Sequence, residues 1–376
     1  MKESMLRLLY RCRNIFLLFI LCSYCRHSED ISLLYSCTNS SKVAGIIVVK
    51  EEARVKVNPS RASNMKKFMR VLLKSMAVLG ISIVGLLVIV FTINIICNKI
   101  EQGKIEPYGQ LVSVNGEKMN VTIQGKGAET IVLLPGFGTA APTLDFKPLI
   151  DELTPYYKIV SIEPFGYGLS EDTAKERSTE NIVSEIHEAL QELKIDRYML
   201  MGHSIAGIYG LDYVNKYPNE VTGFVGIDSS VPTQGGMDTK FPIKSLQLLK
   251  KSGIARILIK FSDDPYAGLP YDDDTKEQIR MITLKNFYNT STSNELEHIS
   301  KNFTAAKTLT FPKDLPLLLF VQAKSGGVEK NWIPLHEEQV KHSVYGKVIT
   351  LDGDHYLHHT KSEEITDNVR SFMQNK

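Results

Sequence analysis

Cysteine is absent from most of this chain. All five cysteines of the 376-residue sequence lie within the first 97 residues, so the remaining 279 residues contain none. This absence excludes a disulfide framework, a cysteine-ligated zinc site and a thiol nucleophile from the larger part of the protein. It is compatible with a location outside the cell.

An excess of charge of either sign is also missing. The sequence has 44 Lys and Arg residues against 42 Asp and Glu residues, and no long basic run. A net charge of +2 therefore gives no reason to expect a nucleic-acid partner. No internal repeat or low-complexity tract is present, and 43% of the residues are hydrophobic. This composition is typical of a globular protein, and the length allows one large domain or two ordinary ones.

A long uncharged stretch does occur, from Met76 to Cys97, and it contains 22 residues. At about 1.5 Å per helical residue it matches the hydrocarbon core of a bilayer, which is about 30 Å thick. Four basic residues precede it closely and two follow: Lys66, Lys67, Arg70 and Lys74, then Lys99 and Lys104. This bias predicts an uncleaved signal anchor over residues 65–99 of a single-pass cell-membrane protein, with a cytoplasmic N terminus and an extracellular body.

Residues 1–64 are predicted to be an unstructured extension, and the sequence leaves open whether they belong to the natural protein. The apolar run Ile15–Cys22 is too short to span a membrane. If it were instead a signal peptide, Met76–Cys97 would become a stop-transfer segment and the topology would invert.

The body, residues 100–375, alternates short apolar runs with amphipathic stretches. The runs are too short for helices, and they predict buried parallel strands at Ile131–Leu134, Ile159–Ile162, Tyr198–Met201 and Phe224–Ile227. Helical patterns between these runs predict a parallel α/β sheet. Gln110–Val114 and Lys118–Gln124 predict an antiparallel edge hairpin, because Asn115-Gly116 links them.

The strand–helix alternation stops at about residue 231 and resumes at about residue 315. The 85 residues between are helix-like and irregular, which predicts a cap over one end of the sheet. Two further strands are expected at Leu317–Val321 and Lys347–Leu351. A closing helix is predicted from about Thr360, with Glu363 completing a capping box.

The central chemical motif is Gly202-His-Ser204-Ile-Ala206. It follows a predicted strand and leads directly into a predicted helix. A turn this sharp strains the backbone of its central residue and exposes the hydroxyl, so Ser204 is the candidate nucleophile. An ordinary capping serine is the alternative interpretation.

A second glycine turn, Pro135-Gly-Phe137-Gly138, follows the strand Ile131–Leu134. Its likeness to a dinucleotide-binding motif is weakened by Pro135 and by two preceding edge strands. We interpret it as an oxyanion loop, in which the N–H groups of Phe137 and Ile205 bind the developing negative charge. No cofactor and no metal ion are predicted.

His355 follows the last predicted strand in Asp352-Gly-Asp-His355-Tyr. A loop histidine at this position can reach the nucleophile and act as general base and then general acid. The neighbouring His358 and His359 are interpreted as helix-start or solvent-exposed histidines.

Together these motifs resemble the α/β-hydrolase superfamily over residues 108–375. The segment Glu163-Pro-Phe-Gly-Tyr-Gly-Leu-Ser170 is similar to a loop of that family, with Glu in place of Asp. The resemblance implies a mostly parallel eight-stranded sheet, with a helical cap (residues 231–315) inserted after the sixth strand. It also implies the chain order nucleophile, acid, histidine.

The acid of this order has two candidates. Members commonly place an Asp after the seventh strand, but the stretch from Phe320 to Glu329 has none, which leaves Glu329. Other members place the acid after the sixth strand, where Asp228 lies 24 residues beyond Ser204. We favour Asp228, because a strand end is held rigidly, whereas Glu329 follows two glycines.

The sequence therefore predicts a membrane-anchored, esterase- or lipase-like serine hydrolase acting on a small-molecule or lipid ester. Ser204 in place of Asp argues against the dehalogenase and epoxide-hydrolase branches. An amidase or peptidase with the same triad, and a catalytically silent binding protein, remain alternatives. Acyl-chain preference and oligomeric state are left open.

Overall fold

The computed structural model describes residues 59–323 and 331–374. Residues 1–58, which include most of the predicted N-terminal extension, lie outside the described residues, as does Glu329. The chain divides into two units, Met1–Gly80 and Ile81–Lys376. The second unit holds the sheet, its helices and the candidate catalytic residues.

The first described element is one long helix, α2 (Pro59–Gln102), which contains the whole predicted span. Its large apolar side chains are mostly exposed, and its most apolar stretch is not buried by the rest of the protein. Among the described residues it is the one helix long and apolar enough to cross a membrane. A helix that is apolar all round and uncovered by protein is typical of a segment buried in lipid.

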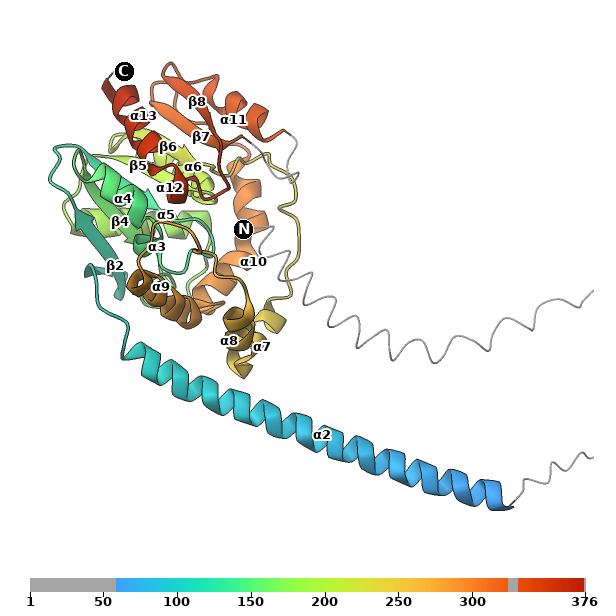
Figure 1. The fold of residues 1–376 in the computed structure, drawn as a ribbon. Helices are drawn as coiled ribbons and strands as arrows, with labels where there is room; N and C mark the ends of the chain where they lie inside the picture. Colours follow the sequence, from blue (N-terminus) through green and yellow to red (C-terminus); the bar gives the residue numbers. More distant parts are fainter. Residues whose placement is uncertain (1–58, 324–330, 375–376) are drawn as a thin grey trace, which may run out of the picture. The chain divides into compact units, whose positions relative to one another are not determined.

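The body is an eight-stranded sheet in the order β1-β2-β4-β3-β5-β6-β7-β8 (Figure 1). The strands are β1 (Gln110–Val114), β2 (Glu117–Gln124), β3 (Thr130–Leu134), β4 (Lys158–Glu163), β5 (Tyr198–His203), β6 (Val221–Ile227), β7 (Leu317–Gln322) and β8 (Gly346–Leu351).

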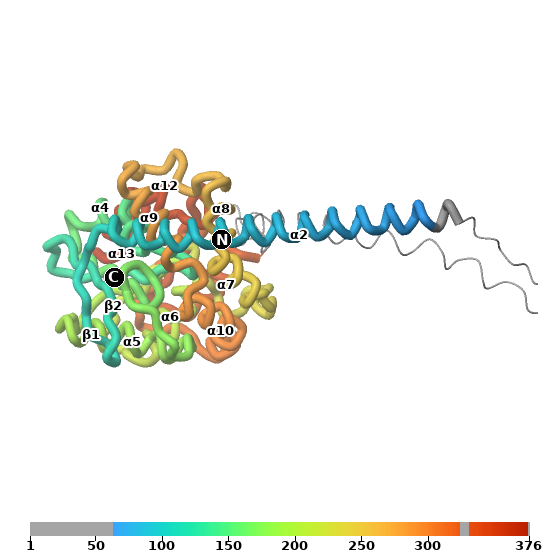
Figure 2. Tube along the Cα trace, turned by 90° about the horizontal axis from the view of Figure 1, so that it is seen from below, coloured from blue at the N-terminus to red at the C-terminus, as the bar shows by residue number. Residues whose placement is uncertain are grey.

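The edge hairpin and the parallel strands are both as predicted. β1 pairs antiparallel with β2 at one edge (Figure 2), and β2 pairs antiparallel with β4. Every later pairing is parallel, and the central strands β3 and β5 are buried throughout. Burial on both faces explains why these strands read as continuous apolar runs rather than as alternating patterns.

Helices cover both faces of the sheet. One face packs against the helices α4 (Lys147–Leu153) and α13 (Ser362–Gln374) through a core that includes Leu133, Met201 and Phe320. The helices α5 (Thr179–Glu192) and α6 (Ala206–Lys216) pack on each other, and α6 contacts β5 and β6. The body also contains the helices α3 (Pro142–Asp145), α11 (Trp332–Val340) and α12 (Leu357–Thr360).

The closing helix differs from its prediction at one end. Thr360 ends the short helix α12, so α13 begins at Ser362, two residues later than expected. The predicted inward face is correct: Ile365 and Val369 are buried, and Phe372 packs against the core.

The cap lies between β6 and β7, as predicted, and is helical. It consists of α7 (Ile243–Ser252), α8 (Ile254–Phe261), α9 (Asp273–Asn286) and α10 (Thr290–Ala306). Asp272 caps α9 and Asn289 caps α10, each accepting a hydrogen bond from the backbone N–H three residues on. These caps explain why a region without strong apolar periodicity still forms two long helices.

Candidate active site

Ser204 occupies the turn between β5 and α6 in a left-handed backbone conformation, with φ of 53°. A Cβ atom on Gly202 would lie 2.9 Å from the Ala206 Cβ atom, so the turn requires small residues on both sides of the serine. The Ser204 N–H donates to the Ile227 carbonyl, and its carbonyl accepts from the Ser230 N–H at 2.7 Å. The turn is thus attached to the end of β6. A non-glycine residue held at positive φ is strain of the kind concentrated at functional sites.

Asp228 follows β6 directly and is fully buried, also at positive φ (41°). Its Oδ1 atom accepts from the Gln322 backbone N–H at 3.0 Å and from the Trp332 indole N–H at 2.7 Å. Its Oδ2 atom accepts from the Gln322 side chain at 2.9 Å and lies 2.6 Å from His355 Nδ1. Four hydrogen-bond partners around one carboxylate occupy both of its oxygens and hold it in one orientation.

His355 is brought to Asp228 from the loop after β8, and its side chain is about one-quarter exposed. Because the carboxylate accepts, Nδ1 carries the proton in this pair, which leaves Nε2 of a neutral imidazole as an acceptor. The 2.6 Å separation lies within the range required of the acid–histidine contact. The structure thus places one of the two predicted acids beside the histidine, whereas the other, Glu329, lies outside the described residues.

His203, which precedes Ser204, was not singled out from the sequence. It is buried, and its Nε2 lies 3.1 Å from the His355 backbone carbonyl. Burial and the nearby His355 and His358 lower the pKa of His203 well below its usual value, so the ring is neutral and donates its Nε2 proton to that carbonyl. His203 therefore attaches the His355 loop to the serine turn. The position of His203 directly before the candidate nucleophile is the sequence feature that could have indicated this role.

The predicted oxyanion loop lies against the nucleophile. A Cβ atom on Gly136 would lie 2.6 Å from His203 Nδ1 and 3.1 Å from the Ser204 Cβ atom, so glycine allows a closer approach than a residue with a side chain could make. Phe137 and Ile205 are both buried. The two backbone N–H groups proposed for the oxyanion thus belong to segments that the structure holds together.

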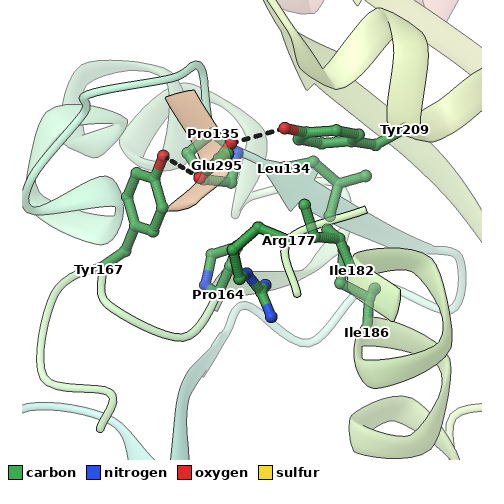
Figure 3. A pocket seen from close by; sticks show the side chains of 9 residues that line it. All are labelled: Leu134, Pro135, Pro164, Tyr167, Arg177, Ile182, Ile186, Tyr209 and Glu295. Carbon is green, nitrogen blue, oxygen red and sulfur yellow. Dashed lines mark hydrogen bonds between the residues drawn. The ribbon is translucent and has the colours of Figure 1, made fainter. Parts of the chain in front are cut away.

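A buried carboxylate from the cap connects these segments. Glu295 of α10 accepts from the Tyr209 hydroxyl at 2.6 Å and from the Tyr167 hydroxyl at 2.7 Å (Figure 3). Tyr209 belongs to α6, the helix after the nucleophile, and the Tyr167 hydroxyl accepts from the Gly138 N–H at 3.4 Å. Burial raises the pKa of Glu295 and the pKa values of both tyrosines. The three side chains line a small pocket with Leu134, Pro135, Pro164, Arg177, Ile182 and Ile186.

Glu163, which replaces the Asp of the family loop, is buried and fully bonded. It accepts from the Tyr108 hydroxyl at 2.8 Å, the Asn120 amide at 2.9 Å and the Leu169 N–H at 2.8 Å. A Cβ atom on Gly168 would overlap the Glu163 carboxylate. The longer side chain therefore fills the space that this glycine leaves, which supports a structural role for Glu163.

Of the two interpretations of His358 and His359, the helix-start position is correct and exposure to solvent is wrong. Both belong to the short helix α12, but they are buried and bond to opposite oxygens of Asp145, at 2.8 Å and 3.0 Å. Burial raises the pKa of Asp145, but the two imidazoles lower it more strongly, so the carboxyl is ionised. Burial lowers the pKa of His358 to about 4. The histidines are needed inside because a carboxylate buried in the core must be compensated.

Among the described residues, Asp145, His358 and His359 form the one group that could hold a metal ion, because their ligand atoms lie within 4.8 Å of one another. Two histidines and one carboxylate would suit zinc. However, each imidazole lies at hydrogen-bond distance from its own carboxylate oxygen, and Tyr266 donates to Asp145 at 2.8 Å. Both Asp145 oxygens are therefore hydrogen-bonded without an ion, while His358 Nδ1 is buried without a partner among the described residues.

Comparison with known proteins shows which fold the chain has. The profile of a family described as "alpha/beta hydrolase fold" matches residues 129–250. The solved structure of the epoxide hydrolase VrEH1 from Vigna radiata superposes with a TM-score of 0.57 at 16% identity, covering 72% of this chain and 98% of its own. The chain has the α/β-hydrolase fold, and the profile match supports its assignment to that superfamily.

Two of the proteins with similar sequences come from Bacillus subtilis and Escherichia coli. The chain is 28% identical over 264 residues to the uncharacterised protein YbdG of Bacillus subtilis (strain 168), covering 67% of this chain and 81% of YbdG. A shorter alignment of 127 residues, also at 28% identity, covers 34% of this chain and 47% of RutD of Escherichia coli O1:K1 / APEC, which is named as a candidate carbamate hydrolase. The fold and these relatives support a hydrolase without specifying the bond that is cleaved.

Proposed function

We propose that this protein is a serine hydrolase that cleaves carboxylic esters through an acyl-serine intermediate. The observation that carries the proposal is the 2.6 Å contact between Asp228 and His355, together with a serine held at positive φ in a strand–turn–helix that is hydrogen-bonded to the end of β6. Nucleophile, acid and histidine occur in the chain order typical of the superfamily.

In the proposed mechanism, the Ser204 hydroxyl attacks the acyl carbon while His355 Nε2 accepts its proton. Asp228 holds the imidazole in the required tautomer and stabilises the imidazolium that forms. The N–H groups of Phe137 and Ile205 donate to the carbonyl oxygen as it becomes negative.

The tetrahedral intermediate then collapses as the bond to the alcohol oxygen breaks and His355 returns the proton to that oxygen. Water, deprotonated by the same imidazole, releases the acid from the acyl-serine and regenerates the Ser204 hydroxyl. The acyl group is thus transferred first to serine and then to water.

We also propose that α2 anchors the enzyme in the cell membrane, with the N terminus cytoplasmic and the body extracellular. The support is a continuous, uncovered apolar helix with basic residues concentrated before the span. Its ester substrate would then be a small molecule or a lipid.

A fluorophosphonate probe that labels active serines tests the nucleophile. We expect labelling of the full chain that is lost in Ser204→Ala and kept in Ser245→Ala, where an exposed serine of α7 is removed. Absence of labelling in the folded wild-type chain would favour the alternative of a silent binding protein.

A substrate screen with graded acyl chains then tests the bond that is cleaved. The limited resemblance to RutD makes carbamates and amides the appropriate second panel. We expect turnover of esters to exceed turnover of matched amides and carbamates. The reverse ranking would replace the ester assignment while keeping the nucleophile.

A further inference from the structure

The cap segment from Ile243 to Phe261, which comprises α7 and α8, has an unusual charge pattern. It contains five basic residues and no acidic residue: Lys244, Lys250, Lys251, Arg256 and Lys260. The protein as a whole is nearly neutral, so this density of positive charge is local. We call this segment the α7–α8 hairpin; its helices pack on each other (Figure 1).

The same hairpin exposes large apolar side chains. Leu248 is 66% exposed, Phe261 is 79% exposed and Ile257 is 39% exposed. The opposite side of α8 faces the protein through the buried Ala255. Short helices with apolar residues on one side and lysines beside them are typical of segments that lie in the boundary between lipid and water.

Arg256 attaches the hairpin to the C-terminal turns of α2. Its guanidinium donates to Asn94 at 3.1 Å, to Asn98 at 2.5 Å and to Glu101 at 2.7 Å. These three acceptors are spaced four and three residues apart, so they share one face of α2.

The backbones also approach closely at this point. A Cβ atom on Gly253, at φ of 82°, would lie 2.7 Å from the Asn94 Cβ atom. Asn94 belongs to the last turn of the predicted span, whereas Glu101 lies beyond its end. This contact therefore holds the hairpin at the level where the span leaves the hydrocarbon core.

We propose that the α7–α8 hairpin docks on the bilayer surface around α2. In this arrangement Leu248, Ile257 and Phe261 enter the headgroup boundary. The exposed Lys244, Lys251 and Lys260 contact anionic headgroups. The inference rests on the proposal that α2 crosses a bilayer.

A lipid surface fits this face better than a second copy of the chain. A symmetric dimer through the hairpin would bring ten positive charges together without an acidic partner from the segment itself. An anionic bilayer offers the complementary charge, and each lysine or arginine near such a surface adds to the attraction.

Depth-dependent quenching in the full-length protein tests the docking. The native cysteines are replaced, and single cysteines at Leu248 or Phe261 carry an environment-sensitive fluorophore. Exposed apolar positions elsewhere, Val344 and Leu111, provide matched controls. The protein is reconstituted in phosphatidylcholine vesicles with or without phosphatidylglycerol.

In anionic vesicles, we expect doxyl-labelled lipid to quench the fluorescence of the labels at 248 and 261 at least about twofold more than that of the labels at 344 and 111. Iodide in the water should show the opposite order. The difference should decrease in pure phosphatidylcholine, and also when Lys244, Lys251 and Lys260 are changed to Gln, because the electrostatic attraction is then removed.

Equal iodide quenching at 261 and 344 would overturn the docking. Shielding of 261 from both quenchers would also overturn it, in favour of a protein contact. Release of the protein by alkaline carbonate would overturn both the span and the docking. None of these outcomes affects the esterase proposal, because fluorophosphonate labelling tests it separately.

Discussion

At the scale of single residues, Asp228 links more of the site than any sequence pattern suggested. Its carboxylate joins the end of β6 to Gln322 of β7, to Trp332 of α11 and to the His355 loop. The Asp228 carboxylate therefore holds these segments together, in addition to contacting the proposed base His355. Asp228 directly follows the end of β6 and has a positive φ of 41°.

We expect Asp228→Asn to reduce kcat on the order of 10⁴-fold, because an amide cannot hold the imidazole in the productive tautomer. Steady-state kinetics with a chromogenic ester measures this loss, and circular dichroism establishes that the variant is folded. Glu329→Gln should change kcat little. A large loss in Glu329→Gln with a small loss in Asp228→Asn would reassign the acid.

The buried His358 predicts a dependence of stability on pH. Its pKa of about 4 in the folded state lies below the ordinary value of 6.5, so below pH 6.5 the unfolded chain binds a proton that the folded chain excludes. Stability is therefore lost as the pH falls from about 6.5 to about 4, by on the order of 3 kcal/mol from this group.

Urea unfolding across that pH range measures the effect. His358→Gln cannot titrate but can still donate to Asp145, so its free energy of unfolding should depend less steeply on pH than that of the wild type. Parallel curves for the two proteins would contradict the assignment.

At the scale of elements, the cap is joined to the catalytic body through polar contacts. Glu295 of α10 holds Tyr209 of α6 and Tyr167, whose hydroxyl reaches the oxyanion loop at Gly138. The cap thus supports both segments that supply the proposed oxyanion donors.

We expect Glu295→Leu to lower both stability and kcat/KM, because two buried tyrosine hydroxyls lose their acceptor at a cost of about 1–3 kcal/mol each. The exposed Glu297 on the same helix gives a matched control, and Glu297→Leu should leave both quantities nearly unchanged. A thermal melt of each variant measures its stability, and ester kinetics measure its kcat/KM. If activity in Glu295→Leu is intact, the contact supports the cap alone.

At the scale of the whole molecule, the placement of the body depends on the basic residues before the span. We expect protease added to intact cells to remove the body while the N terminus stays protected, because four basic residues precede the span and two follow it. A tag at each end, followed by immunoblotting, measures this. If the body is degraded only after the cells are broken, the topology is inverted.

The sequence alone determined those features that depend on residues close together in the chain. Apolar runs bounded by glycine, proline or aspartate predicted the buried strands, and Asn115-Gly116 predicted the edge hairpin. The turn around Ser204 could be predicted in the same way, because the serine and the small residues that the turn requires lie within five consecutive positions. Thr360 was misread because two helices share that boundary and a capping motif does not say which helix it serves.

Only the tertiary structure decided which distant side chains meet. Asp228 and His355 are 127 residues apart, and their contact depends on the order of β6, β7 and β8 in the sheet. The same holds for His203 under the His355 carbonyl, for Glu295 between two tyrosines and for Arg256 against α2. Local patterns reveal a side chain's chemistry and its face, but its partner is set by packing between elements, which no local spacing records.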